Sequence, residues 1–130
     1  MATRTVLALA AALEAATGLA LMIYPPVVAR LLLGAELSGA GMALGRVAGF
    51  ALLSLGLACR PSPDAHSGVT PALRAMLTYN LLATIYLLYL GTGGEWVGNL
   101  LWPAVAIHAV LAILLARTWC KNRQTQETKP

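Results

Sequence analysis

The sequence from Thr5 to Pro26 is TVLALAAALEAATGLALMIYPP, and Glu14 is the only charged residue in it. A helix needs about 20 apolar residues to cross the hydrocarbon core of a bilayer, and Thr5–Tyr24 has this length. Pro25 and Pro26 must end or kink the helix, because proline lacks an N–H donor and clashes with the preceding turn. The run exceeds the roughly 7–15 apolar residues of a signal peptide, so we expect a retained membrane span.

The rest of the chain repeats this pattern of long apolar runs separated by polar or glycine-rich breaks. Val27–Gly34 is too short to span and carries Arg30, which predicts a short helix lying in the membrane interface. Polar residues from 121 to 130 predict a disordered tail. The sequence therefore predicts an all-α fold, a four-helix transmembrane bundle with a short interfacial helix after the first span. The expected spans are residues 5–24, 40–59, 71–90 and 99–119.

The composition excludes an ordinary soluble protein. Of the 130 residues 58% are hydrophobic and 11% are charged, against roughly 45–50% and about 25% in soluble chains. The net charge of +4 does not indicate nucleic-acid binding, because the basic residues other than Arg46 lie at the expected membrane borders, where they anchor helices. Lipid is the solvent that such a chain requires.

The basic residues also predict an orientation. With four spans, the side that holds both termini carries seven of them, and the other side carries Arg30 alone. By the positive-inside rule we expect both termini in the cytoplasm of a bacterial-type inner membrane. Cys59 and Cys120 then face a compartment that keeps thiols reduced. Trp119 lies in the inner aromatic belt, and the outer belt consists of Tyr24, Tyr89, Trp96 and Trp102.

Each expected span carries one strongly polar residue: Glu14, Arg46, Asn80 and His108. At 1.5 Å per residue, three of them lie about 14–15 Å below the outer surface, and Arg46 lies about 9 Å below it. A long arginine side chain can cover that difference. We therefore expect the four side chains to meet near the middle of the bilayer.

Contact between these four polar side chains is also favoured because it lowers the free-energy cost of placing them in the membrane. A lone charge at the centre of a span costs about 2.5–3.5 kcal/mol on insertion scales, so a Glu14–Arg46 ion pair would be expected. Thr17 and Thr84 lie one turn from Glu14 and Asn80 on the same helix faces, and Tyr79 is a further polar neighbour in the third span. The cluster predicts a site that binds a ligand or a proton, while a purely structural role in fixing helix packing is the alternative.

Gly41, Gly45 and Gly49 repeat every four residues on the second span. Such a ridge of small residues allows a neighbouring helix to approach closely. The pattern predicts helix packing, against either another span of this chain or another copy.

Motifs of known chemistry are missing from the sequence. We find no paired-aspartate protease site, no zinc-type cluster of His, Cys and Glu, no phosphate-binding Gly-Lys loop and no second intramembrane histidine that could complete a bis-histidine haem site. No catalytic residue and no metal ligand is assigned, and no cofactor is indicated. This favours a protein that is not an enzyme.

The segment Ala11–Gly18, with Glu14 at its centre, resembles the first helix of the small multidrug-resistance transporters, in which a glutamate couples transport to protons. The resemblance covers eight residues. The third span departs from that family's Gly- and Trp-rich pattern, with Tyr79, Asn80 and Tyr86 in its place. No family is assigned to the chain on this basis.

Three functional hypotheses follow. The first is a small inner-membrane protein that uses the polar cluster as a binding or accessory component, alone, as a homo-oligomer or within a larger membrane complex. The second is a proton-coupled transporter of small molecules that uses Glu14. The third is a membrane enzyme acting on a lipid or a quinone-like substrate. The partners expected are the bilayer and a hydrophobic small molecule or lipid.

Overall fold

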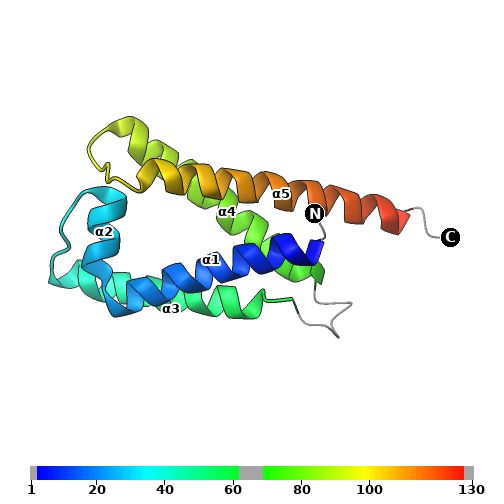
Figure 1. Ribbon diagram of the computed structural model, residues 1–130, viewed down its shortest axis with the longest axis horizontal. Coiled ribbons are helices and arrows are strands. Elements are labelled where there is room, and N and C mark those ends of the chain that lie inside the picture. The colour runs from blue at the N-terminus through cyan, green and yellow to red at the C-terminus, as the bar shows by residue number, and fades with distance from the viewer. Residues whose placement is uncertain (1–2, 62–68, 128–130) are drawn as a thin grey trace.

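The computed structural model describes residues 3–61 and 69–127, and all regular structure within these ranges is helical (Figure 1). Four helices are long and apolar enough to cross a membrane, and a fifth, short helix follows the first of them. The predicted four-helix bundle with a short helix after the first span is confirmed, and the chain is an integral membrane protein. The helices are α1 (Thr3–Ile23), α2 (Pro25–Leu33), α3 (Gly39–Ala58), α4 (Val69–Gly93) and α5 (Leu101–Glu127).

The two prolines separate α1 from α2. Tyr24 has φ −144° and ψ 71°, outside the helical region, and Pro25 is the first residue of α2. Proline is accepted there because the first N–H groups of a helix have no partner inside it. The short helix thus begins two residues earlier than expected. It ends at Gly34, whose positive φ of 69° allows its N–H to donate to the carbonyl of Arg30.

Several predicted helix ends differ from the structure by a few residues, among them the start of α4 and the end of α5. Helix α4 begins at Val69, so Pro71 lies in its first turn, and most of the expected loop before it lies outside the described residues. Helix α5 continues to Glu127, so the expectation of a disordered tail from residue 121 is wrong up to that residue. Lys, Arg, Gln and Glu are good helix formers, and their polarity ends a membrane span without ending a helix. Residues 128–130 lie outside the described part.

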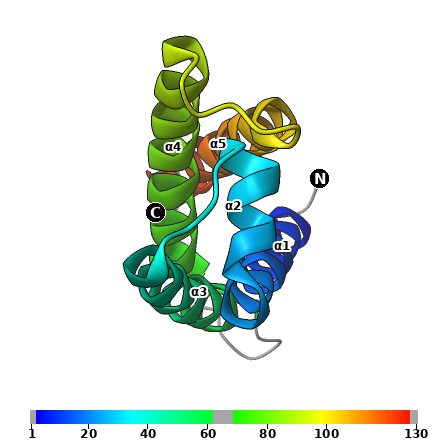
Figure 2. The same cartoon turned by 90° about the vertical axis from the view of Figure 1, so that its left-hand side faces the viewer.

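The long helices form two pairs, α1 with α3 and α4 with α5 (Figure 2). Glycine allows α1 and α3 to approach very closely. A Cβ atom added to Gly49 would lie 2.7 Å from the carbonyl oxygen of Gly18, and one added to Gly56 would lie 2.6 Å from that of Ala11. Backbone-to-backbone packing of this kind is how small residues hold membrane helices together.

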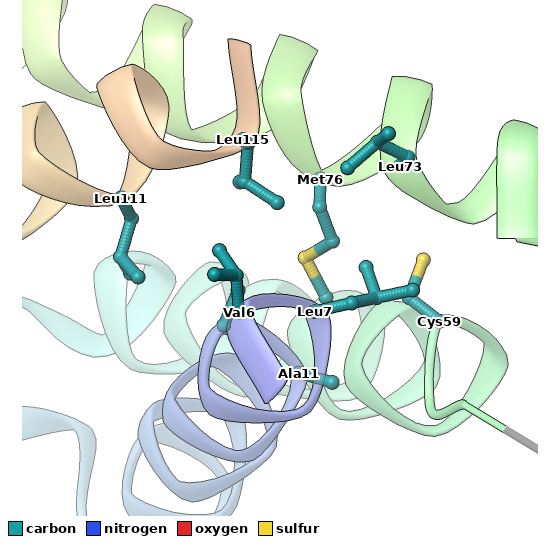
Figure 3. Packing of buried hydrophobic residues seen from close by; sticks show 9 residues of the cluster. Val6, Leu7, Ala11, Cys59, Leu73, Met76, Leu111 and Leu115 are labelled. Carbon is teal, nitrogen blue, oxygen red and sulfur yellow. The ribbon is translucent and has the colours of Figure 1, made fainter. Parts of the chain in front are cut away.

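The two pairs meet in an apolar core near the end of the bundle that carries both termini (Figure 1). Side chains of α1 point toward Met76 and Leu73 of α4 and toward Leu111 and Leu115 of α5 (Figure 3). Cys59, directly after α3, closes the same cluster. The cluster consists of Val6, Leu7, Ala10, Ala11, Cys59, Leu73, Met76, Leu111 and Leu115.

At the opposite end, α2 runs across the bundle and holds the connection between α4 and α5 (Figure 1). The backbone N–H of Gly98 donates to the carbonyl of Leu32 at 3.1 Å, and that of Leu100 donates to Leu31 at 2.8 Å. A Cβ on Gly98 would clash with the carbonyl group of Leu31, so only glycine fits. The two helix pairs are therefore joined at both ends of the bundle. Glu14 and Asn80, the buried polar residues, lie in the interior between these two ends.

The outer surface of the bundle is apolar. Large hydrophobic side chains are exposed on all four long helices, among them Leu9, Phe50, Leu82 and Ile113. A soluble protein would not expose so much apolar surface. Lipid is the environment that fits these helices.

Candidate functional site

Glu14 lies in the interior of the bundle on the buried face of α1. It follows Leu7 and Ala11 and precedes Gly18, and this helical spacing places all four on the buried face. Only 1% of its side chain is exposed. Within the described residues neither carboxylate oxygen accepts a hydrogen bond. A buried polar group without a partner costs about 1–3 kcal/mol, so this position is unfavourable for folding.

Asn80 on α4 and His108 on α5 form the best-defined polar contact of the interior. Asn80 is fully buried, and its Nδ2 donates to the carbonyl of Met76, one turn earlier, at 3.0 Å. Its Oδ1 therefore faces away from that carbonyl and lies 2.9 Å from Nδ1 of His108. Because Oδ1 can only accept, Nδ1 of His108 must carry the hydrogen. Asn80 thus fixes both the position of the imidazole and its neutral tautomer.

Glu14 meets this pair without a direct hydrogen bond. Its Oε1 lies 3.8 Å from Nδ1 of His108. The Nδ1 hydrogen already points to Asn80, so the neutral imidazole offers Glu14 nothing to accept. An imidazole that gains a second proton on Nε2 becomes a cation, and the same distance then makes an ion pair. The contact between Glu14 and His108 is therefore an ion pair only when the imidazole is protonated.

Tyr79 completes the site from α4. Its ring meets that of His108 edge to face, with centroids 6.0 Å apart and planes at 75°. Its phenol also lies close enough to Glu14 for the two groups to interact electrostatically. That contact does not have the geometry of a hydrogen bond, since both Glu14 oxygens are unpartnered in the described part of the chain. Tyr79, expected as a supporting residue, is a direct neighbour.

Arg46 does not join the site. Its side chain is exposed on α3, and it has neither a hydrogen bond nor an ion pair within residues 3–61 and 69–127. The expected Glu14–Arg46 ion pair is therefore wrong. Helix α3 packs against α1 and α2, whereas Glu14 faces α4 and α5 from the other side of α1. The structure brings together three of the four expected polar residues, Glu14, Asn80 and His108.

The two threonines expected to support the cluster bond to their own helices. Oγ1 of Thr17 donates to the carbonyl of Leu13 at 2.9 Å, and Oγ1 of Thr84 donates to that of Asn80 at 2.7 Å. This back-bonding is common for threonine inside helices. Neither hydroxyl supplies the missing partner of Glu14.

The glycine ridge of the second span packs within the chain. Gly49 lies against Gly18 and Met22 of α1, and Gly45 lies against Pro25, the first residue of α2. Gly41 contacts Leu37, just before its own helix. All three glycines therefore lie against residues of the same chain, and Gly49 is the one that lies against another span.

The site has the chemistry of a hydrogen-bond acceptor in an apolar interior. Among the described residues no group of three His, Cys, Asp or Glu side chains could hold a metal ion. One unpartnered carboxyl group beside a fixed imidazole can accept a proton or a hydrogen bond from a ligand.

Comparison with known proteins adds no assignment, because no protein-family model, no curated protein and no solved structure matches the chain.

Proposed function

We propose that this membrane protein binds a small hydrophobic molecule or lipid at Glu14, Asn80 and His108, and acts as a binding or accessory component of the membrane. The ligand would carry a hydrogen-bond donor on an apolar body. The observation behind the proposal is that Glu14 is buried without a partner. A donor from a ligand would remove the 1–3 kcal/mol or so that the unpartnered group costs.

The neighbours of Glu14 support a specific kind of ligand. Asn80 has its amide hydrogen bonds directed to Met76 and His108, so it holds the imidazole and leaves Glu14 as the acceptor. Apolar side chains surround the site on α1 and α5. An amine or a hydroxyl group suits the carboxyl group, whereas a second carboxylate would be repelled.

A ligand can reach the site more easily from the side of His108 than from the side of Glu14. Its side chain is 14% exposed, against 1% for Glu14. A ligand or a proton arriving from the membrane would therefore meet the imidazole first and the carboxyl group 3.8 Å behind it.

Thermal unfolding in neutral detergent, with three ligands that share one apolar body, tests the proposal. We expect 1-adamantylamine or 1-adamantanol to raise the unfolding temperature of the wild type in a saturable way, and adamantane-1-carboxylate not to. Glu14→Gln should lose the response, and the control Thr17→Val should keep it, because Thr17 bonds only to its own helix. Equal responses of wild type and Glu14→Gln would contradict the proposed site.

Proton-coupled transport with Glu14 is the second candidate. The specific observation in its favour is that a partly exposed imidazole lies 3.8 Å from a buried carboxyl group, which is a short path for a proton. Protein in liposomes should then carry protons at a rate that changes between about pH 6 and 8. Glu14→Gln should abolish this flux and His108→Gln should weaken it. An unchanged flux in Glu14→Gln would exclude this function for the site.

Arg46 supports the accessory part of the proposal. A charge on the outside of a span costs about 2.5–3.5 kcal/mol at the centre of the bilayer and less toward its surface. Arg46 is seven residues into α3 and has no partner in the described chain. A hydrogen-bond acceptor on a neighbouring subunit would offset that cost. The inner-membrane location and the cytoplasmic termini remain part of this proposal and rest on the basic residues at one end of the bundle.

A further inference from the structure

Two arginines converge on Trp119 at the end of the bundle that carries the termini. The guanidinium carbon of Arg74, from α4, lies 5.9 Å from the centroid of the Trp119 ring, and that of Arg123, from α5, lies 5.6 Å from it. Trp119 packs against the apolar core, so its ring has a fixed support. Both arginine side chains are exposed. Two cationic groups from different helices thus share one anchored indole.

The group lies at the depth of the lipid headgroups. Arg74 is three residues, or about 5 Å, from the start of the α4 span at Pro71. Trp119 is eighteen residues, or about 27 Å, from Leu101 at the far end of α5. The hydrocarbon core is about 30 Å thick, so the ring lies at its border and Arg123 lies one turn beyond.

Nothing in the described chain neutralises these charges. Neither Arg74 nor Arg123 has an ion pair with a carboxylate whose side chain the structure describes. The described carboxylate side chains lie elsewhere, that of Glu14 in the interior and those of Glu36 and Glu95 in the connections at the α2 end. The ring attracts each guanidinium but only weakly where water has access. Two like charges beside one ring therefore favour the arrival of an anion.

The geometry points to a headgroup site for an anionic phospholipid, formed by Arg74, Trp119 and Arg123. The planar guanidinium groups bind the phosphate oxygens in pairs. The indole, apolar on its body and polar at its N–H, packs against the glycerol region. The site lies on the surface between α4 and α5, and it is separate from the interior site of Glu14.

The binding can be followed through Trp119 itself. In a Trp96→Phe, Trp102→Phe background, Trp119 is the remaining tryptophan of the chain. Phosphatidylglycerol is added to the protein in neutral dodecyl maltoside micelles, with phosphatidylcholine and inorganic phosphate as comparisons. We expect a saturable change in Trp119 emission with phosphatidylglycerol alone. A hydrogen bond to a charged group is worth about tenfold or more in affinity, so Arg74→Gln with Arg123→Gln should bind at least tenfold more weakly.

A matched variant separates a site from general charge. Arg60→Gln with Arg117→Gln removes the same charge from the same end of the bundle without touching the ring, and it should bind like the wild type. An equal loss in both double variants would overturn the proposal, as would equal binding of phosphatidylcholine or the same response to free phosphate. Should the first variant fail to fold by circular dichroism, Arg74→Lys with Arg123→Lys decides. It keeps the charge but not the paired contacts, and binding equal to wild type would overturn the site.

Discussion

Nδ1 of His108 lies 3.8 Å from Oε1 of Glu14, and this contact joins α5 to α1 in the interior of the bundle. The hydrogen on that nitrogen is directed to Asn80 instead, at 2.9 Å. Glu14 is therefore enclosed beside a polar group that does not satisfy it. This relationship separates the site from an ordinary structural cluster, in which each buried polar group has a partner.

The first prediction concerns coupling between polar residues. Because Glu14 and Arg46 do not touch, the losses or gains in unfolding free energy of Glu14→Gln and Arg46→Gln should add to within about 0.5 kcal/mol in the double variant. Asn80→Ala and His108→Ala serve as the positive control, since these side chains share a hydrogen bond and should couple by roughly 0.5–3 kcal/mol. Denaturation in detergent measures both cycles. Strong coupling of Glu14 with Arg46 would place the arginine in the site after all.

The second prediction concerns the close approach of α1 and α3. A methyl group on Gly49 would lie 2.7 Å from the Gly18 carbonyl oxygen and 2.8 Å from the Met22 nitrogen. Overpacking of this kind costs about 1–3 kcal/mol or more, so Gly49→Ala should lower the unfolding temperature clearly. Gly39→Ala is the matched control, because nothing lies within 4 Å of its added Cβ. If the two variants unfold alike, the helices do not pack as described.

The third prediction concerns the two cysteines. Cys59 is 3% exposed, whereas Cys120 is exposed, and burial raises the pKa of the Cys59 thiol. A raised pKa leaves less of the reactive thiolate near neutral pH. N-ethylmaleimide should therefore modify Cys120 in the Cys59→Ala variant much faster than Cys59 in the Cys120→Ala variant. The rates should become similar once the protein is unfolded in strong detergent. Fast labelling of Cys59 in the folded protein would argue against the core at this end.

The fourth prediction concerns orientation. The sequence assigns seven basic residues to the side that holds both termini and Arg30 alone to the other, which favours cytoplasmic termini. Reporter fusions at Lys121 and within residues 61–67 should report cytoplasm, and a fusion at Gly93 should report the outer side. A cytoplasmic signal from Gly93 would reverse the proposed orientation.

Much of the fold could be predicted from the sequence because the bilayer imposes simple rules. Apolar length gave the four spans, and Pro25 ended the first of them where expected. The end of α5 could not be found from polarity, because residues such as Lys121 and Arg123 leave the membrane but continue the helix. Depth along a span likewise predicted that Glu14, Asn80 and His108 lie close together.

The predicted ion pair of Arg46 with Glu14 was wrong because depth in the membrane does not tell toward which side of the helix a side chain points. At its depth the Arg46 side chain was long enough to reach Glu14. However, Arg46 follows Gly45 directly, so its side chain points about 100° around the helix from the direction in which Gly45 faces. Gly45 and Gly49 face α2 and α1, which leaves Arg46 off that interface. The spacing of Gly45 and Gly49 therefore already indicated that Arg46 lies off the interface with α1. Which helices surround α1 on its other face depends on packing across the whole bundle, and no local pattern in the sequence shows it.

The unfolding temperature of Glu14→Leu in neutral detergent tests the central claim, that Glu14 is kept for binding and not for stability. Leucine fills a similar volume without unpartnered polar atoms, so the variant should be more stable by about 1–3 kcal/mol and unfold several degrees higher. Asn80→Leu is the control and should be less stable, since Asn80 bonds to both Met76 and His108. A rise for Glu14→Leu together with a fall for Asn80→Leu is the predicted result. A fall for Glu14→Leu as large as that for Asn80→Leu would show that Glu14 holds the bundle together, and it would contradict the claim.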